Sequence, residues 1–153
     1  MTLDLSLSPK KNCDCVGFSD ADWGGDLDDT KSTSGYVFQI GGEAISWRSK
    51  KQTSVALSKA EAEYVALAST AQEALWLQHL LTDLITEPLG SMVIYEDNQS
   101  AITMTKGPQF HGHSKHISIK YHFIRDLVTD GTVEVKYCPT QEMIADMLTK
   151  GLP

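Results

Sequence analysis

Short runs of alternating apolar and polar residues dominate the first third of the chain and predict β-strands. These runs end at acidic or glycine-rich turns, and the pair Gly41 and Gly42 permits the positive φ of a tight turn between two of them. The expected strands are Val16–Asp20, Tyr36–Ile40 and Ala44–Trp47. Three strands joined by short connections predict an antiparallel meander.

The pattern becomes helical after Ser58, which precedes Glu61 at the spacing of a capping box. An alanine- and leucine-rich segment without proline follows and predicts a long helix at Lys59–Leu84. Further on, strand patterns alternate with helical ones. We expect strands at Met92–Tyr95 and Thr132–Tyr137, and helices at Gln99–Thr105, Ile117–Val128 and Met143–Lys150. The order βββαβ(α)αβα predicts an α/β fold, a mixed five-stranded sheet with helices on both faces.

Composition agrees with one compact domain. The chain has 153 residues, 41% hydrophobic and 22% charged, which excludes a disordered or fibrous protein. We expect residues 1–15 to form a polar tether and residues 16–153 the domain. Cys13, Cys15 and Cys138 are odd in number and unpaired in spacing, which favours reduced thiols. Without a long apolar run or a signal-peptide pattern, the sequence predicts a soluble, non-secreted protein with no membrane partner.

The charge is acidic overall but unevenly distributed. A net charge of −7 argues at first against a nucleic-acid partner. However, Ala44–Ala60 and Asn98–Arg125 contain no acid, and the second segment holds four of the five histidines. The bases of these two islands are Arg48, Lys50, Lys51 and Lys59, then Lys106, Lys115, Lys120 and Arg125. Charge alone favours neither phosphate binding nor ordinary solvated faces.

Two carboxylates end the buried rows of two predicted strands. Asp20 follows Val16 and Phe18 on one face of the first strand, and Asp97 follows Val93 and Tyr95 in the same way. If the strands are parallel neighbours, the two acids meet at the sheet edge where α/β proteins bind ligands. A close pair of carboxylates needs a cation, and hard oxygen ligands favour Mg²⁺ or Mn²⁺ over zinc.

Further acids at this site have to come from helices. The long helix offers Glu61 or Glu63, which lie on opposite sides of its apolar stripe, so periodicity does not choose between them. The last helix offers Glu142 or Asp146, which are four residues apart and share a face. From spacing alone, both choices stay open.

Seven strings of residues resemble the ribonuclease H domain at the C-terminal end of the Pol polyprotein of copia-type LTR retrotransposons. They occur in the family's order and spacing, and the resemblance covers about Val16 to Leu152. The strings are Phe18–Asp26, Lys31–Phe38, Ile45–Trp47 with Ser49–Gln52, Ala60–Tyr64, Glu96–Ile102, Lys115–Ile117 with Tyr121–Ile124, and Ala145–Lys150.

The resemblance implies the ribonuclease H fold and a metal-dependent endonuclease. Four acids would hold two Mg²⁺ ions, with Mn²⁺ as a substitute, and the family pattern assigns them to Asp20, Glu63, Asp97 and Asp146. The implied reaction is hydrolysis of the RNA strand of an RNA–DNA hybrid to 5′-phosphate and 3′-hydroxyl ends. The implied partner is the reverse transcriptase domain of the same polyprotein, in a cytoplasmic virus-like particle, and the isolated domain is expected to be a monomer.

Recognition of the hybrid requires contacts to 2′-hydroxyls and to phosphates. Ser58, Asn98 and Gln99 lie beside the predicted catalytic acids in the sequence and are expected to contact the RNA strand. We expect Trp47 in the core rather than stacked on a sugar. The expected phosphate contacts are Lys50, Lys51, Lys115, His116 and Lys120.

The chain departs from many ribonucleases H in one loop. Cellular and many retroviral relatives carry a histidine before the last aspartate, whereas Cys138–Ala145 contains none, and Glu142 is a candidate stand-in. Two alternatives stay open. One is a catalytically silent module that binds nucleic acid or tethers a polymerase, and the other is an integrase-like core, whose last acid would be a glutamate.

Overall fold

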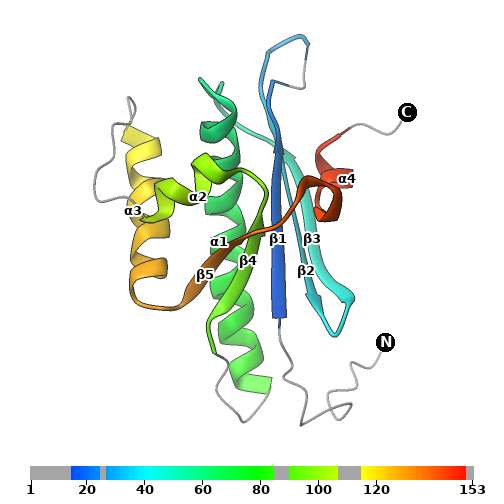
Figure 1. The fold of residues 1–153 in the computed structure, drawn as a ribbon, viewed down its shortest axis with the longest axis vertical. Helices are drawn as coiled ribbons and strands as arrows, with labels where there is room; N and C mark the ends of the chain where they lie inside the picture. Colours follow the sequence, from blue (N-terminus) through cyan, green and yellow to red (C-terminus); the bar gives the residue numbers. More distant parts are fainter. Residues whose placement is uncertain (1–14, 25–26, 85–89, 107–114, 151–153) are drawn as a thin grey trace.

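The computed structural model describes residues 15–24, 27–84, 90–106 and 115–150, with side chains throughout these ranges except at 115–117. Five strands form one sheet in the order β3-β2-β1-β4-β5 (Figure 1). They are β1 (Cys15–Asp22), β2 (Thr33–Ile40), β3 (Glu43–Lys51), β4 (Met92–Glu96) and β5 (Val133–Tyr137). β1 is antiparallel to β2 and parallel to β4, which confirms the predicted mixed sheet. Of the predicted tether at residues 1–15, residues 1–14 lie outside the described ranges, and Cys15 is the first residue of β1.

The meander forms where it was expected. Gly41 and Gly42 take φ values of +60° and +85° in the turn between β2 and β3, a conformation that L side chains rarely adopt. The core position predicted for Trp47 is wrong, because its side chain is 62% exposed. β3 is the edge strand. The short C-terminal helix at Asp146–Thr149 packs mainly on β1 and β2, so Trp47 on β3 stays largely uncovered.

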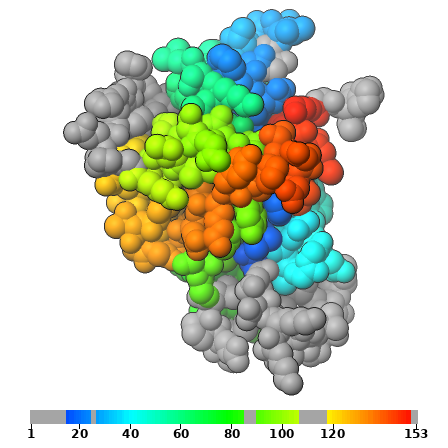
Figure 2. All heavy atoms as spheres, in the orientation of Figure 1, coloured from blue at the N-terminus to red at the C-terminus, as the bar shows by residue number. Residues whose placement is uncertain are grey.

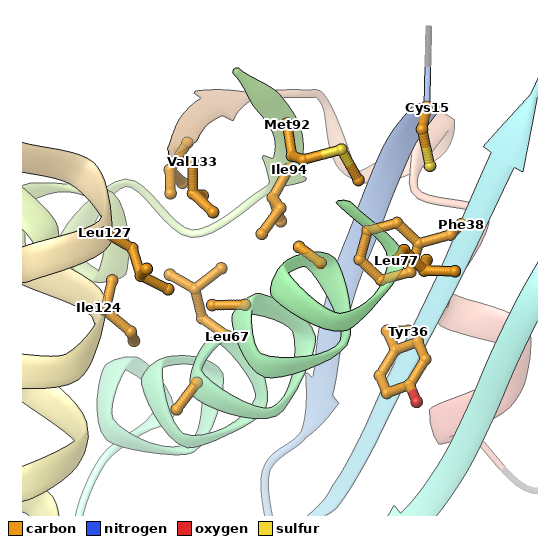
Figure 3. Close-up of a cluster of buried hydrophobic side chains, with 14 of the residues drawn as sticks. Cys15, Tyr36, Phe38, Leu67, Leu77, Met92, Ile94, Ile124, Leu127 and Val133 are labelled. Atoms are coloured by element: carbon orange, nitrogen blue, oxygen red, sulfur yellow. The ribbon is translucent and has the colours of Figure 1, made fainter. Parts of the chain in front are cut away.

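One face of the sheet carries the large helices. α1 (Lys59–Leu84) has the predicted bounds, and α3 (Lys115–Thr129) packs against it, while α2 (Gln99–Lys106) contacts α1, α3 and β5. Figure 3 shows Leu67 of α1 facing Ile124 and Leu127 of α3, and Leu77 of α1 beside Phe38 of the sheet. This cluster is the main core, and it fixes α1 against the middle of the sheet.

The opposite face is covered by the C-terminal segment. A 3₁₀ turn at Thr140–Glu142 leads to α4 (Asp146–Thr149), so helices lie on both faces as predicted. The predicted helix Met143–Lys150 is too long, because Met143 is extended, at φ −79° and ψ 96°. Its side chain is buried with Val37 and Cys138 in a second small core. Tertiary packing therefore overrides the local helical pattern at this point.

Candidate active site

β1 and β4 bring their aspartates to one edge of the sheet. Phe18 pairs with Tyr95 in the parallel register, so Asp20 and Asp97, each two residues further, follow at matching positions. Asp20 is 4% exposed, and Asp97 is half-buried at the bend after β4. The predicted juxtaposition of these two carboxylates is therefore present in the structure.

α1 supplies the third acid through its N-terminal turn. Ser58 caps the helix, since its Oγ accepts the backbone N–H of Glu61 at 3.1 Å, and the Glu61 carboxylate accepts the N–H of Leu57. Glu61 thus serves the helix end. Glu63 turns toward the sheet and is fully buried beside Asp20 and Asp97. Helical periodicity left the choice between Glu61 and Glu63 open. In the structure it is Glu63, the residue assigned by the resemblance, that lies beside the two aspartates.

The three carboxylates form a tight cluster. Asp20, Glu63 and Asp97 each offer an oxygen, and these oxygens all lie within 4.8 Å of one another. Both oxygens of Glu63 and Oδ1 of Asp97 are buried without a hydrogen-bond partner among the described residues. Buried carboxylate oxygens without donors are costly unless a proton or a cation reaches them. Oxygen-only ligands of this kind suit a hard divalent ion, so the residues fit Mg²⁺.

The surroundings favour the protonated form of these acids. Burial raises the pKa of Asp20 to about 6; a hydrogen bond from Thr149 lowers it, and the charges of Asp97 and Asp146 raise it. Burial also raises the pKa of Glu63 to about 9, with contributions from Asp20 and Asp97. A bound cation would reverse this balance, because its charge stabilises the carboxylates.

Asp146 lies next to this cluster rather than within it. It opens α4, close enough for its charge to raise the pKa of Asp20, but its Oδ1 is 2.6 Å from Nζ of Lys150. The alternative candidate Glu142 is exposed in the 3₁₀ turn. The four predicted acids thus lie at the same edge of the sheet: Asp20, Glu63 and Asp97 form the cluster, and Asp146 lies beside it. In the space-filling view, blue, green and red-orange segments from distant parts of the chain meet at this upper end (Figure 2).

Glu96 is a fifth acid at this rim that the sequence analysis did not select. It is fully buried, its Oε2 accepts the backbone N–H of Asn98 at 3.1 Å, and its Oε1 has no partner among the described residues. Burial and then the charge of Glu63 raise its pKa well above the usual range. Strand alternation already contained the signal, because Glu96 shares a face with the core residue Ile94.

The predicted RNA contacts lie near the acids, and two have structural roles. The Ser58 hydroxyl caps α1, and Oδ1 of Asn98 caps α2 by accepting the backbone N–H of Ala101 at 2.8 Å. Gln99 is exposed at the start of α2 and lines a surface pocket with Lys136 and Tyr137. Their contact with RNA stays a prediction.

Three predicted phosphate contacts meet in one small pocket. Lys50 and Lys51 from the end of β3 and Lys120 from α3 line a pocket of about 140 Å³, so the two basic islands converge in space. Gln52 joins this pocket to the acids, because its Nε2 donates to Oγ of Ser34 in the pocket wall and to the carbonyl of Ala62, beside Glu63. The side chains of Lys115 and His116 lie outside the described residues.

The segment before Asp146, which contains no histidine, begins with a buried thiol. Cys138 is 6% exposed, and burial raises its pKa to about 11, with the charges of Asp97 and Glu96 adding to the shift. It therefore stays a neutral thiol at physiological pH.

Among the described helices, none combines the length and the hydropathy that a membrane span requires.

Comparisons with known proteins agree with this geometry. No protein-family model matches the chain. It is 46% identical over 137 residues to the retrovirus-related Pol polyprotein from transposon TNT 1-94 of Nicotiana tabacum, with 90% of this chain and 10% of that protein covered. It is 47% identical over 135 residues to the Pol polyprotein from transposon RE1 of Arabidopsis thaliana, with 88% and 9% covered. The chain thus spans about a tenth of the length of these relatives.

Solved structures with the same fold include a ribonuclease H1 and a foamy viral reverse transcriptase. LC11-RNase H1 in complex with an RNA/DNA hybrid superimposes with a TM-score of 0.60 at 14% identity, covering 88% of this chain and 93% of that one. A foamy viral protease–reverse transcriptase in complex with an RNA/DNA hybrid gives 0.63 at 16% identity, covering 88% and 19%. With the sequence relatives and the fold in agreement, the chain is homologous to a segment of copia-type retrotransposon Pol polyproteins and has the ribonuclease H-like fold, so it fits the ribonuclease H domain of such a polyprotein.

Proposed function

We propose that the chain is a metal-dependent ribonuclease H that hydrolyses the RNA strand of RNA–DNA hybrids during reverse transcription of a retrotransposon, giving 5′-phosphate and 3′-hydroxyl ends. The observation that carries the proposal is the buried cluster of Asp20, Glu63 and Asp97, whose oxygens lie within 4.8 Å of one another. The hybrids named for two structural neighbours support the substrate class.

The acids act as ligands. Asp20, Glu63 and Asp97 would hold Mg²⁺. Asp146 would leave its ion pair with Lys150 to help bind a second ion. Mn²⁺ could replace Mg²⁺ among the same oxygen ligands. The chemistry that two such ions would supply, when bound, is activation of a water and stabilisation of the leaving oxygen. Thr149 orients Asp20 through its hydrogen bond, and α1 presents Glu63 from a capped, rigid helix end.

Substrate recognition falls to the side chains around the acids. Ser58, Asn98 and Gln99 would face 2′-hydroxyls in the shallow minor groove, which distinguishes RNA from DNA. Lys50, Lys51 and Lys120 would neutralise phosphates without reading sequence. We further propose that the isolated domain is a monomer, and that it works beside the reverse transcriptase domain of the polyprotein in cytoplasmic virus-like particles.

The proposal is tested by cleavage of an RNA–DNA hybrid labelled on the RNA strand, with Mg²⁺ and with Mn²⁺. Asp97→Asn keeps the shape of the side chain but removes one ligand charge, and should lower the cleavage rate at least a hundredfold. Asp126→Asn, the same change at an exposed position on α3, is the matched control and should cleave as wild type. Equal rates for wild type and Asp97→Asn would refute the assignment.

The same assay separates the alternatives. A silent binding module would retain hybrid binding and show no cleavage dependent on Mg²⁺. An integrase-like core would join DNA strands on a duplex DNA substrate, and its activity would depend on Glu142 rather than on Asp146. Because Glu142 is exposed and Asp146 lies beside Asp20, the structure favours the nuclease.

A further inference from the structure

An apolar groove lies on the α4 face of the sheet, on the side away from α1. Its volume is about 410 Å³, and its lining combines residues of β2, β3 and the C-terminal segment. The seven lining residues are Val37, Gln39, Ala44, Trp47, Ile144, Met147 and Leu148. Trp47 is 62% exposed and Met147 is 69% exposed, and both are residue types enriched at protein interfaces.

The chemistry of the groove argues against contact with the phosphates of a nucleic acid. None of the seven lining side chains is charged, so the groove offers no partner to a phosphate. The pocket lined by Lys50, Lys51 and Lys120, called the lysine pocket below, lies by contrast on the other side of the sheet, among β3, α1 and α3. The groove therefore calls for an apolar protein segment.

The size of the groove argues for a tethered partner. A free-standing interface uses roughly 20–30 residues a side, and seven lining residues fall well short of that. A covalently linked partner needs less area, because a short linker gives an effective concentration of about millimolar. About nine tenths of the length of the polyprotein relatives lies outside the matched segment. In the foamy viral protein the matched fold makes up 19% of a chain that contains a reverse transcriptase.

We propose that the Trp47–Met147 groove is the docking seat for an apolar segment of the reverse transcriptase in the same Pol polyprotein. The inference rests on the proposed linkage to a reverse transcriptase, and it does not require that the chain cleaves hybrids. Trp47 is the anchor, and Met147 adapts to the docked surface.

Docking at this groove acts on the helix that holds Asp146. Leu148 lines the groove, and its carbonyl accepts the hydroxyl of Ser49 in β3, which fixes α4 to the sheet edge. Asp146 and Thr149 belong to the same four-residue helix, and Thr149 bonds to Asp20. A segment seated against Met147 and Leu148 therefore orders α4 together with Asp146 and Thr149.

Hydrogen exchange tests the proposal on two proteins, the 153-residue chain alone and the same chain produced as one polypeptide with its reverse transcriptase. We expect amides of β3 and α4 to exchange at least tenfold more slowly in the linked polypeptide. Trp47→Gln combined with Met147→Gln should abolish this protection. Trp76→Gln is the matched control, because Trp76 is 57% exposed on α1, and it should leave the protection unchanged.

Three outcomes would overturn the proposal: identical exchange in the two proteins, protection that appears only when hybrid is added, or sedimentation showing that the chain alone dimerises through Trp47. Protection can be compared in the unmutated proteins, so the test does not depend on the folding of a variant. Hybrid cleavage is measured in parallel on the chain alone. Loss of cleavage with intact protection would contradict the proposed function only, and cleavage without protection would contradict the docking seat only.

Discussion

Thr149 of α4 donates a hydrogen bond to Asp20 of β1, with 2.8 Å between Oγ1 and Oδ2, so the last helix directly tunes the first carboxylate. Burial raises the pKa of Asp20 to about 6 even though this bond acts to lower it. Thr149→Val removes the donor and should raise the pKa of Asp20 by about one to two units, because a hydrogen bond to a charged group contributes about 1.5–3 kcal/mol.

The consequence is a weaker metal site near neutral pH. The acidic limb of the pH–rate profile, and of Mg²⁺ binding followed by calorimetry, should move to higher pH in Thr149→Val. Thr82→Val is the control, since Thr82 is exposed on α1 and donates to its own helix backbone, at the carbonyl of Gln78. A profile unchanged in Thr149→Val would show that the hydrogen bond does not govern Asp20.

The raised pKa values of Asp20 and Glu63 make the metal-free protein less stable as pH rises. Burial raises the first to about 6 and the second to about 9, so the folded state binds more protons than the unfolded state above about pH 4. The stability that the protonated carboxyls contribute is fully present below about pH 4, and it is lost as the pH rises through about 6 and then about 9. Thermal unfolding in EDTA should therefore show a Tm that falls between pH 5 and pH 9.

Glu63→Gln tests the origin of that slope. The glutamine does not titrate, so the fall in Tm above pH 7 should become smaller in EDTA; the remainder belongs to Glu96, whose pKa burial also raises. Adding Mg²⁺ to wild type should restore Tm at high pH, because the ion binds the folded state alone. A Tm that rises with pH in EDTA would contradict the raised pKa values of Asp20 and Glu63.

Glu96 accepts the backbone N–H of Asn98 and also places an ionisable group in the buried interior, and two substitutions separate these two effects. Glu96→Gln keeps an acceptor for the backbone N–H of Asn98 and removes a buried ionisable group, so the free energy of unfolding in EDTA at pH 8 should be unchanged or higher. Glu96→Ala removes the acceptor as well and should cost about 1–3 kcal/mol. Urea denaturation measures both, and equal losses in the two variants would contradict this division.

Gly35 sets the distance between β2 and α4. A Cβ at this position would lie 2.8 Å from Cγ2 of Thr149 and 3.1 Å from Cβ of Leu148, so Gly35→Ala must shift α4. Because α4 carries Asp146 and Thr149, we expect at least a tenfold loss of Mg²⁺-dependent cleavage, while overpacking costs only about 1–3 kcal/mol of stability. Gly90→Ala, whose Cβ would meet nothing within 4 Å, should change neither quantity.

The sequence predicted the elements whose local pattern and tertiary packing agree. Lys59–Leu84 has the predicted bounds because a capping box begins it and an apolar segment buries it. Asp20 and Asp97 could be paired because a parallel register joins two strands whose faces were already known from alternation. These are local signals that combine in only one way.

The remaining features depend on what packs against them. Trp47 resembles a core residue locally, but the edge position of β3 and the shortness of α4 leave it exposed. Met143 fits a helix by pattern, yet its side chain fills a small core beneath the sheet and its backbone extends. Helical periodicity could not choose Glu63, since the apolar sides of α1 are too similar; the family resemblance made that choice.

The lysine pocket leads to a prediction about salt. Each lysine that neutralises a phosphate releases counterions, so the logarithm of the binding constant falls with the logarithm of salt concentration by about one unit per contact. Lys50→Gln and Lys120→Gln should each reduce that slope by about one for an RNA–DNA hybrid, measured in the Asp97→Asn background to prevent cleavage. They should weaken binding to every hybrid sequence alike, because phosphates carry no sequence information.

Lys136→Gln provides the control, since Lys136 is exposed on β5, 3.7 Å from Glu134, and lies outside the lysine pocket. Its slope should match that of the parent. Lys51 makes a poorer test than Lys50, because its Nζ is 3.0 Å from Oδ2 of Asp29 and part of its charge is already balanced. An equal reduction in Lys136→Gln, or no reduction in Lys50→Gln and Lys120→Gln, would mean that the two basic islands meet in space without binding the substrate.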